Sequence, residues 1–265
     1  MFFASDGVCY CLRRWGKGEA LLMLHGFTGS GRVWESLHFL GWRMCAVDLL
    51  GHGETDAPTD PDRYRIESAA ADLASMLNEP VFVLGYSMGG RLALYLALHF
   101  PDKVRGLILE SASPGLESEQ ERVTRALSDL ALADAIERDG IAAFVDYWER
   151  LPLFASQTPD QRAMFRPIRL GQRPHGLANS LRGMGAGVQP SLWGRLHEIA
   201  IPTLILTGAL DAKYCAIGER MASLMPHAQQ VIIPNAGHTP HLEQPDAFHA
   251  AVQSFLRGAK GNELG

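Results

Sequence analysis

A serine between two glycines is the residue in this chain that is best placed to do chemistry. Residues 85–89 are Gly-Tyr-Ser-Met-Gly, with an apolar segment before them and a helical pattern that starts at Ser87. In a nucleophile elbow, a strand turns directly into a helix in this way. The corner residue is strained, and a Cβ at either glycine would collide with the neighbouring chain. We therefore predict that Ser87 is a reactive centre and not part of a simple glycine-rich turn.

A serine hydroxyl needs a base to take its proton and an acid to orient that base. Asp211 and His238 each follow a strand-like segment, in the order Ser, Asp, His that is typical of α/β-hydrolases. Asp211 could instead only cap the helix after it, and Glu243 is a second candidate acid. His241 is a second candidate base. We favour His238 because the glycine before it, in the loop after the strand at 229–233, places it at the edge of the sheet.

Two backbone amides are candidates for an oxyanion hole. Residues 25–30 are His-Gly-Phe-Thr-Gly-Ser, and the glycines of this loop allow the amide of Phe27 to point into the site. The amide of Met88, at the N-terminus of the helix after Ser87, is the second donor. We expect His25 to order the loop and not to act in catalysis.

Strands and helices alternate along most of the chain, which predicts an α/β fold with a doubly wound, mostly parallel sheet. The expected strands are 8–15, 20–24, 43–48, 80–85, 104–109, 203–207 and 229–233. The expected helices between them are 66–78, 87–100, 212–225 and 245–256, with a frayed polar tail to residue 265.

The alternation stops in the middle of the chain. Only helical patterns occur there, at 118–138, 141–150, 159–171 and 175–184. We predict an α/β core made of residues 1–114 and 197–265, with a helical cap, residues 115–196, inserted between its two parts.

The composition limits the classes of function. The 265 residues are 47% hydrophobic and 20% charged, with a net charge of −5. These values are typical of a soluble globular protein and argue against nucleic acid or an anionic membrane as a partner. No segment has the length of an apolar membrane span, and the N-terminus lacks the pattern of a secretory signal. The four cysteines show no disulfide spacing, so we expect reduced thiols and a cytoplasmic protein.

Arg91 lies one helical turn after Ser87 and on the same face of the helix. An arginine below a reactive serine is unfavourable to bury unless it meets an anion. Either it forms an internal salt bridge with a carboxylate of the cap, or it binds a carboxylate of the substrate. The predicted cap contains arginines and no lysine, which favours bidentate binding of carboxylates by some of them.

The whole chain resembles the α/β-hydrolase superfamily and, within it, the 2-succinyl-6-hydroxy-2,4-cyclohexadiene-1-carboxylate synthases of menaquinone biosynthesis. The elbow and the histidine loop at 237–243 are shared by many hydrolases. The more specific matches are Arg91, Leu-Pro-Leu-Phe at 151–154 and Gln-Pro-Ser-Leu-Trp at 189–193. Asp-Ala-Lys-Tyr at 211–214 also matches.

The resemblance implies a carbon–oxygen lyase that eliminates pyruvate from a small polyanionic cyclohexene, with Ser87 acting as a base and with no metal or cofactor. It also implies that Arg91, Arg125, Arg169, Tyr86 and Trp148 bind the substrate. Arg122, one turn before Arg125, is an alternative for its role, and Ala186 stands where family members often have threonine.

The alternative function is a serine hydrolase that cleaves an ester or a carbon–carbon bond of an acidic substrate with the same three residues. In both cases we expect a monomer or a small homo-oligomer.

Overall fold

The computed structural model describes residues 2–261, and its centre is an eight-stranded sheet with the order β1-β2-β4-β3-β5-β6-β7-β8. The first three strands of this order pair antiparallel, and all later pairs are parallel. The strands are β1 (Phe2–Ser5), β2 (Val8–Gly16), β3 (Glu19–Leu24), β4 (Trp42–Val47), β5 (Val81–Tyr86), β6 (Val104–Glu110), β7 (Thr203–Gly208) and β8 (Ala228–Ile233).

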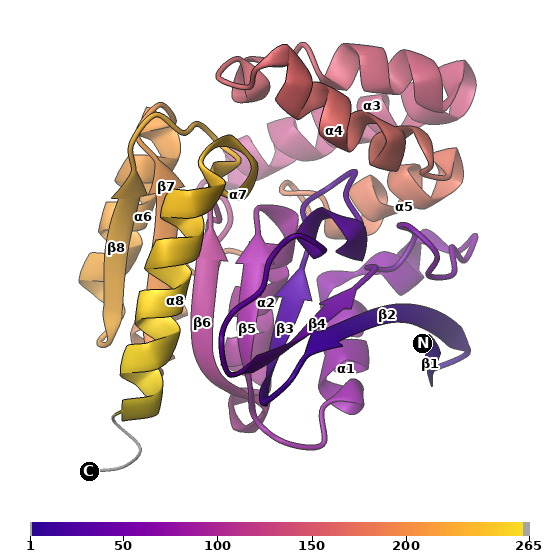
Figure 1. The fold of residues 1–265 in the computed structure, drawn as a ribbon. Coiled ribbons are helices and arrows are strands. Elements are labelled where there is room, and N and C mark those ends of the chain that lie inside the picture. The colour runs from indigo at the N-terminus through magenta and orange to yellow at the C-terminus, as the bar shows by residue number, and fades with distance from the viewer. Residues whose placement is uncertain (1, 262–265) are drawn as a thin grey trace.

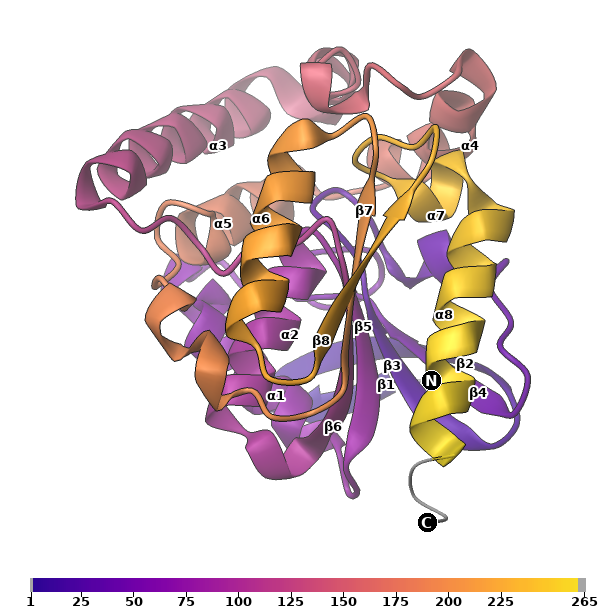
Figure 2. The same ribbon diagram turned by 90° about the vertical axis from the view of Figure 1, so that its left-hand side faces the viewer.

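Helices cover both faces of the sheet. In Figure 2, α1, α2 and α6 lie on one side and α8 lies on the other. Each face has its own apolar core, which explains why the central strands are apolar without alternation. The helices are α1 (Ile66–Met76), α2 (Met88–His99), α3 (Glu119–Trp148), α4 (Pro159–Leu170), α5 (Pro174–Met184), α6 (Ala212–Leu224), α7 (Pro240–Glu243) and α8 (Pro245–Gly261).

The sheet confirms the predicted fold class, and some details differ, among them the short helix α7, which the sequence analysis did not predict. The sequence analysis did not identify β1, which has only four residues and pairs with β2 at the edge of the sheet. The expected end of the last helix at 256 was wrong, because α8 continues to Gly261. Residues 262–265 of the expected tail lie outside the described residues.

Between β6 and β7, the part of the chain that the structure describes contains α3, α4 and α5 and no strand. Gly140, with a φ of 81°, interrupts α3 and separates the two helical stretches that the sequence predicted there. A small apolar core joins α3 and α5. Figure 1 shows these helices at the end of the sheet where β3, β5 and β6 finish. They therefore lie over the edge at which a parallel sheet presents its functional loops.

The turn from β5 into α2 leaves no room for a side chain at Gly85 or at Gly89. A Cβ at Gly85 would lie 2.5 Å from the carbonyl oxygen of Gly89, and a Cβ at Gly89 would overlap the carbonyl oxygen of Leu24 at the end of β3. Ser87 itself has a φ of 50° and a ψ of −106°, so the expected strain is present. Because Gly85 and Gly89 have no side chain, α2 can start directly against the end of β3.

We predict that Gly89→Ala lowers the free energy of unfolding by about 2–4 kcal/mol, because the added methyl group must displace backbone atoms. The matched control is Gly258→Ala in α8, where nothing lies within 4 Å of the added Cβ and alanine favours the helix by up to about 1 kcal/mol. Urea denaturation of both variants measures the difference. Equal stabilities would show that the close approach at Gly89 is not a constraint.

Candidate active site

The structure brings Ser87, His238 and Asp211 together at the end of the sheet. The Nε2 atom of His238 lies 3.2 Å from the Oγ atom of Ser87, and its Nδ1 atom lies 2.8 Å from an Oδ atom of Asp211. The three residues follow β5, β8 and β7, whose carboxyl ends are at the same edge. A hydroxyl, an imidazole and a carboxylate in this relay can activate the serine as a base or as a nucleophile.

Asp211 serves both purposes that the sequence left open. One of its oxygens accepts a hydrogen bond from the amide of Tyr214 at 3.2 Å and caps α6, while the other binds His238. Because the cap holds the carboxylate at the helix start, its second oxygen has a fixed direction. The start of α6 therefore orients Asp211, and Asp211 in turn orients His238.

The two alternative residues support the histidine loop instead. Glu243 accepts hydrogen bonds from the amides of Gly237 and Thr239, at 2.7 and 2.9 Å. His241 lies beside the buried carboxylate of Glu110, with its Nδ1 atom at 2.8 Å. These contacts hold the loop on both sides of His238, so neither residue is available as a partner of Ser87.

The loop after β3 forms a tight turn next to the serine. The amide of Gly29 donates to the carbonyl oxygen of Gly26 at 3.0 Å, and Thr28 has a φ of 70°. Phe27 and Met88 both line the pocket beside Ser87. Met88 is the first residue of α2, where an amide has no acceptor within the helix. The two predicted amides therefore belong to segments that meet at the reactive hydroxyl.

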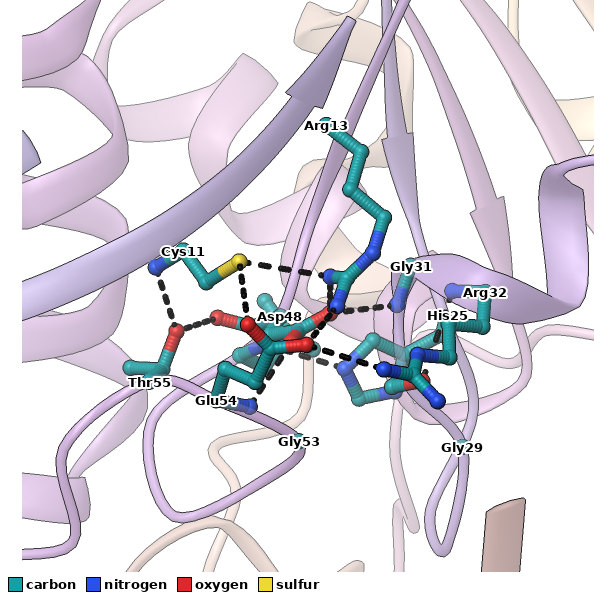
Figure 3. Close-up of polar contacts among 12 residues, drawn as sticks. Cys11, Arg13, His25, Gly29, Gly31, Arg32, Asp48, Gly53, Glu54 and Thr55 are labelled. Atoms are coloured by element: carbon teal, nitrogen blue, oxygen red, sulfur yellow. Dashed lines mark hydrogen bonds and ion pairs between the residues drawn. The ribbon is translucent and has the colours of Figure 1, made fainter. Parts of the chain in front are cut away.

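A polar network centred on the buried side chains of His25 and Asp48 holds this loop in place (Figure 3). The Nδ1 atom of His25 lies 2.8 Å from the carbonyl oxygen of Gly26, and its Nε2 atom accepts from the amide of Leu49 at 2.9 Å. These partners assign the proton to Nδ1 of a neutral ring. Burial lowers the pKa of His25, consistent with this state. His25 thus orders the loop, as its position in the sequence predicted.

Asp48 is the acidic centre of the same network and is fully buried. It accepts hydrogen bonds from the amides of Gly31 and Glu54 and pairs with the guanidinium of Arg13 at 2.6 Å. Burial alone would raise the pKa of this carboxyl group, but these donors hold it below its usual value. The network in Figure 3 thus joins β2, β4 and the segment after β3.

Next to Ser87 lies a cavity of about 220 Å³, which we call the main pocket. It is lined by the three predicted catalytic residues, by Phe27 and Met88, and by residues of α3 and α5. Its polar and aromatic walls include Tyr86, Arg91, Arg125, Asp129, Trp148, Lys213 and Tyr214.

Arg91 lies at the wall of the main pocket and has no salt bridge among residues 2–261. One of its terminal nitrogens donates to the carbonyl oxygen of Met184 at 3.0 Å and to the side chain of Gln189 at 2.5 Å. Burial lowers its pKa to about 10, which leaves the guanidinium charged at neutral pH. The internal salt bridge that the sequence left open is therefore not formed within the described residues.

The other two predicted arginines differ in their surroundings. Arg125 lines the main pocket, and its Nε atom is 2.8 Å from a carboxylate oxygen of Asp129. Arg169 is buried, lies 2.8 Å from Glu149 and stacks on Phe154. It lines a smaller adjacent cavity and not the main pocket. Only two of the three arginines therefore face the space beside Ser87.

Tyr86 and Trp148 lie where the sequence analysis expected them, at the wall of the main pocket. The hydroxyl of Tyr86 is 3.0 Å from that of Thr239, and its ring faces His238. Trp148 packs against Phe27, and its buried Nε1 atom has no hydrogen-bond partner among the described residues.

Sequence reasoning missed two charged residues of the main pocket. Lys213 lines it from the first turn of α6, two residues after Asp211. Asp129 lines it from α3, and one of its buried oxygens has no hydrogen-bond partner among the described residues. The matching Asp-Ala-Lys-Tyr stretch pointed to Lys213. The spacing of four residues after Arg125 is the signal that could have identified Asp129.

We also searched residues 2–261 for a metal site and for a membrane-spanning helix. No group of three or more metal-ligating side chains occurs in this part of the chain. None of its helices is long and apolar enough to cross a membrane.

Comparison with known proteins agrees with this arrangement. A family model for the alpha/beta hydrolase fold matches residues 19–245. A Bacillus subtilis protein described as a putative 2-succinyl-6-hydroxy-2,4-cyclohexadiene-1-carboxylate synthase is 46% identical, over 95% of this chain and 96% of its own. This chain belongs to the α/β-hydrolase family, among the 2-succinyl-6-hydroxy-2,4-cyclohexadiene-1-carboxylate synthases.

Solved structures of α/β-hydrolases show the same overall similarity. The structure of MenH from S. aureus superimposes with a TM-score of 0.90 at 35% identity, covering 94% of this chain and 98% of that one. A malate-bound thermophilic esterase from Thermogutta terrifontis has a TM-score of 0.82 at 27% identity, with 97% of each chain covered. The same overall fold thus occurs in a protein named MenH and in a protein named an esterase.

We predict that His52 makes the folded protein less stable in mild acid. Burial, and then the neighbouring His25, lower its pKa to about 3. The unfolded chain binds this proton below pH ~6.5 and the folded protein does not, so stability falls as the pH drops below that value. Between pH 7.5 and pH 5, this histidine should remove about 2 kcal/mol from the free energy of unfolding.

Urea denaturation at the two pH values tests this prediction. His52→Asn should lose about 2 kcal/mol less than the unchanged protein over this range. The control is His38→Asn at an exposed position, which should leave the pH dependence as it is. The same pH dependence in His52→Asn and in the unchanged protein would contradict the prediction.

Proposed function

We propose that this protein eliminates pyruvate from 2-succinyl-5-enolpyruvyl-6-hydroxy-3-cyclohexene-1-carboxylate and forms 2-succinyl-6-hydroxy-2,4-cyclohexadiene-1-carboxylate. The observation that carries the proposal is a Ser–His–Asp relay facing a pocket that also contains the guanidinium of Arg91, which forms no salt bridge with any described residue. The names of the relatives support the same reaction.

In this mechanism, Ser87 removes a proton from the ring carbon next to the succinyl ketone. His238 takes up the serine proton, and Asp211 holds the imidazole and stabilises its positive charge. A double bond forms at that carbon, the existing double bond of the ring moves by one position, and the carbon–oxygen bond to the enolpyruvyl group breaks. The released enolate gains a proton and becomes pyruvate. No metal or cofactor takes part.

The negative charge that develops on the ketone oxygen needs hydrogen-bond donors that are already in place. The amides of Phe27 and Met88 are our candidates, because the turn after β3 and the start of α2 hold them at the wall of the main pocket. In this role the His25 and Asp48 network is a support for catalysis, since it fixes the loop that carries the Phe27 amide.

The substrate carries three carboxylates, and the main pocket offers three cationic side chains. We assign substrate binding to Arg91, Arg125 and Lys213, with Tyr86 and Trp148 as walls. Arg169 stays a candidate for the adjacent cavity, where Glu149 already neutralises much of its charge. In this arrangement, residues 115–196 act as a cap that supplies part of the cationic surface.

We further propose that the enzyme works in the cytoplasm on a diffusible small molecule, as a monomer or a small homo-oligomer. Its four cysteines are free, which suits a reducing compartment.

The alternative function is hydrolysis of an ester or a carbon–carbon bond in an acidic substrate. The similarity to the esterase from Thermogutta terrifontis favours this alternative, since the same relay can attack a carbonyl group. The two functions release different products, pyruvate in the elimination and an alcohol or acid in the hydrolysis, so an assay of the products separates them.

We expect the purified protein to release pyruvate from the cyclohexene substrate, measured with a coupled lactate dehydrogenase. Ser87→Ala should lower kcat by roughly 10²- to 10⁴-fold, because the base is lost. The control is Ser254→Ala on the exposed face of α8, which should retain full activity. If aryl esters turn over rapidly while pyruvate stays at the blank level, the hydrolase is the correct function.

Replacement of Arg91 should separate substrate recognition from the relay. Arg91→Met should lower kcat/KM for the polyanionic substrate by roughly 30- to 1000-fold, because a carboxylate loses its buried partner. Turnover of a neutral aryl ester should change by less than about threefold, and Arg195→Met, at an exposed ion pair, should leave both reactions unchanged. Equal losses on the two substrates would show that Arg91 is only structural.

A further inference from the structure

We propose that Gln189 is a positioning residue that holds Arg91 at the main pocket without neutralising it. The inference rests on the proposed function, because it concerns how the pocket presents a positive charge to a substrate carboxylate. Gln189 does not line the main pocket itself. It acts through Arg91.

The contact is short and buried. The Oε1 atom of Gln189 lies 2.5 Å from a terminal nitrogen of Arg91, and the side chain of Gln189 is almost fully buried. The same nitrogen donates to the carbonyl oxygen of Met184, the last residue of α5. A carbonyl at a helix C-terminus favours a nearby cation. Two neutral acceptors thus fix one nitrogen and leave the rest of the guanidinium for the pocket.

The backbone around Gln189 is tied to the core. Its amide donates to the carbonyl oxygen of Gly185 at 3.2 Å. Nearby, the amide of Leu192 donates to Pro114 at 2.7 Å, and the indole of Trp193 donates to Gly115 at 3.0 Å. These bonds join the chain entering the cap to the chain leaving it. The Gln-Pro-Ser-Leu-Trp stretch therefore closes the base of the cap and presents Gln189 to Arg91 in one fixed place.

The orientation of the Gln189 amide is set by Arg91. A guanidinium only donates, so the oxygen of the amide must face it. The Nε2 atom is then buried, and no described residue accepts a hydrogen bond from it. A buried donor without a partner is unfavourable. The contact between the amide oxygen and Arg91 is therefore kept although the amide nitrogen gains no partner among the described residues.

Neutrality is the property that matters at this position. A carboxylate there would form a salt bridge with Arg91, cancel its charge and repel the incoming substrate. The charged and titratable groups that act on Arg91 are Tyr214, Arg125 and Asp129, and Asp129 is already paired with Arg125. Arg91 therefore keeps its full positive charge for the substrate.

Gln189→Glu tests the proposal, because it keeps the shape and the acceptor while adding a charge. We expect kcat/KM for the cyclohexene substrate to fall by roughly 30- to 300-fold, mainly through KM. Hydrolysis of a neutral aryl ester should stay within about twofold. Gln189→Leu, which adds no charge, should cost roughly 10-fold on the polyanion because Arg91 loses its anchor but keeps its charge. This second variant also keeps the test valid if Gln189→Glu does not fold.

The matched control is Gln253→Glu in α8, where the amide oxygen of a buried glutamine accepts from the amide of Leu40. It makes the same chemical change outside the pocket and should leave kcat/KM unchanged. Equal losses on the polyanion and the ester, or unchanged KM in both Gln189 variants, would overturn the role of Gln189. If the unchanged protein releases no pyruvate, the proposed function fails instead, whatever the variants do.

Discussion

The close approach of α2 to the end of β3 is the constraint on which the rest of the structure depends. Because Gly89 has no side chain, α2 starts directly against the carbonyl oxygen of Leu24. This contact places Ser87 at the corner, the Met88 amide at the helix start and the loop of Phe27 beside both. A reactive hydroxyl and its candidate oxyanion donors thus follow from one packing contact, which tolerates no Cβ atom at Gly89.

The arginines around the two cavities differ in the kind of partner that holds them. Arg169 is paired with Glu149, and Arg125 with Asp129, so part of the charge of each is neutralised. Arg91 is instead held by a carbonyl group and an amide. Charge left without a partner in a partly buried place is unfavourable for folding, but it is what a polyanionic ligand requires. In our proposal, recognition of a substrate carboxylate is the reason why Arg91 is held in this unfavourable way.

The relay and the scaffold do not by themselves decide the reaction. The similarity of the fold to an esterase at a TM-score of 0.82 shows that the same framework carries different chemistry. In this chain, the surface that faces the relay combines Arg91, Arg125 and Lys213 with aromatic walls. In our proposal, this cationic surface selects a substrate from which Ser87 takes a proton, in place of a carbonyl group to attack.

The sequence by itself determined the α/β fold, the elbow and the Ser–Asp–His order, because these depend on local patterns: strand and helix periods and glycines at fixed spacing. It did not identify the short strand β1, nor the pairing of each charge. Only the tertiary structure showed that Gln189 is the partner of Arg91, 98 positions away in the chain, and that Arg169 faces an adjacent cavity. Such contacts depend on how the cap packs on the sheet, and residues distant in the chain leave no periodic signal of their meeting.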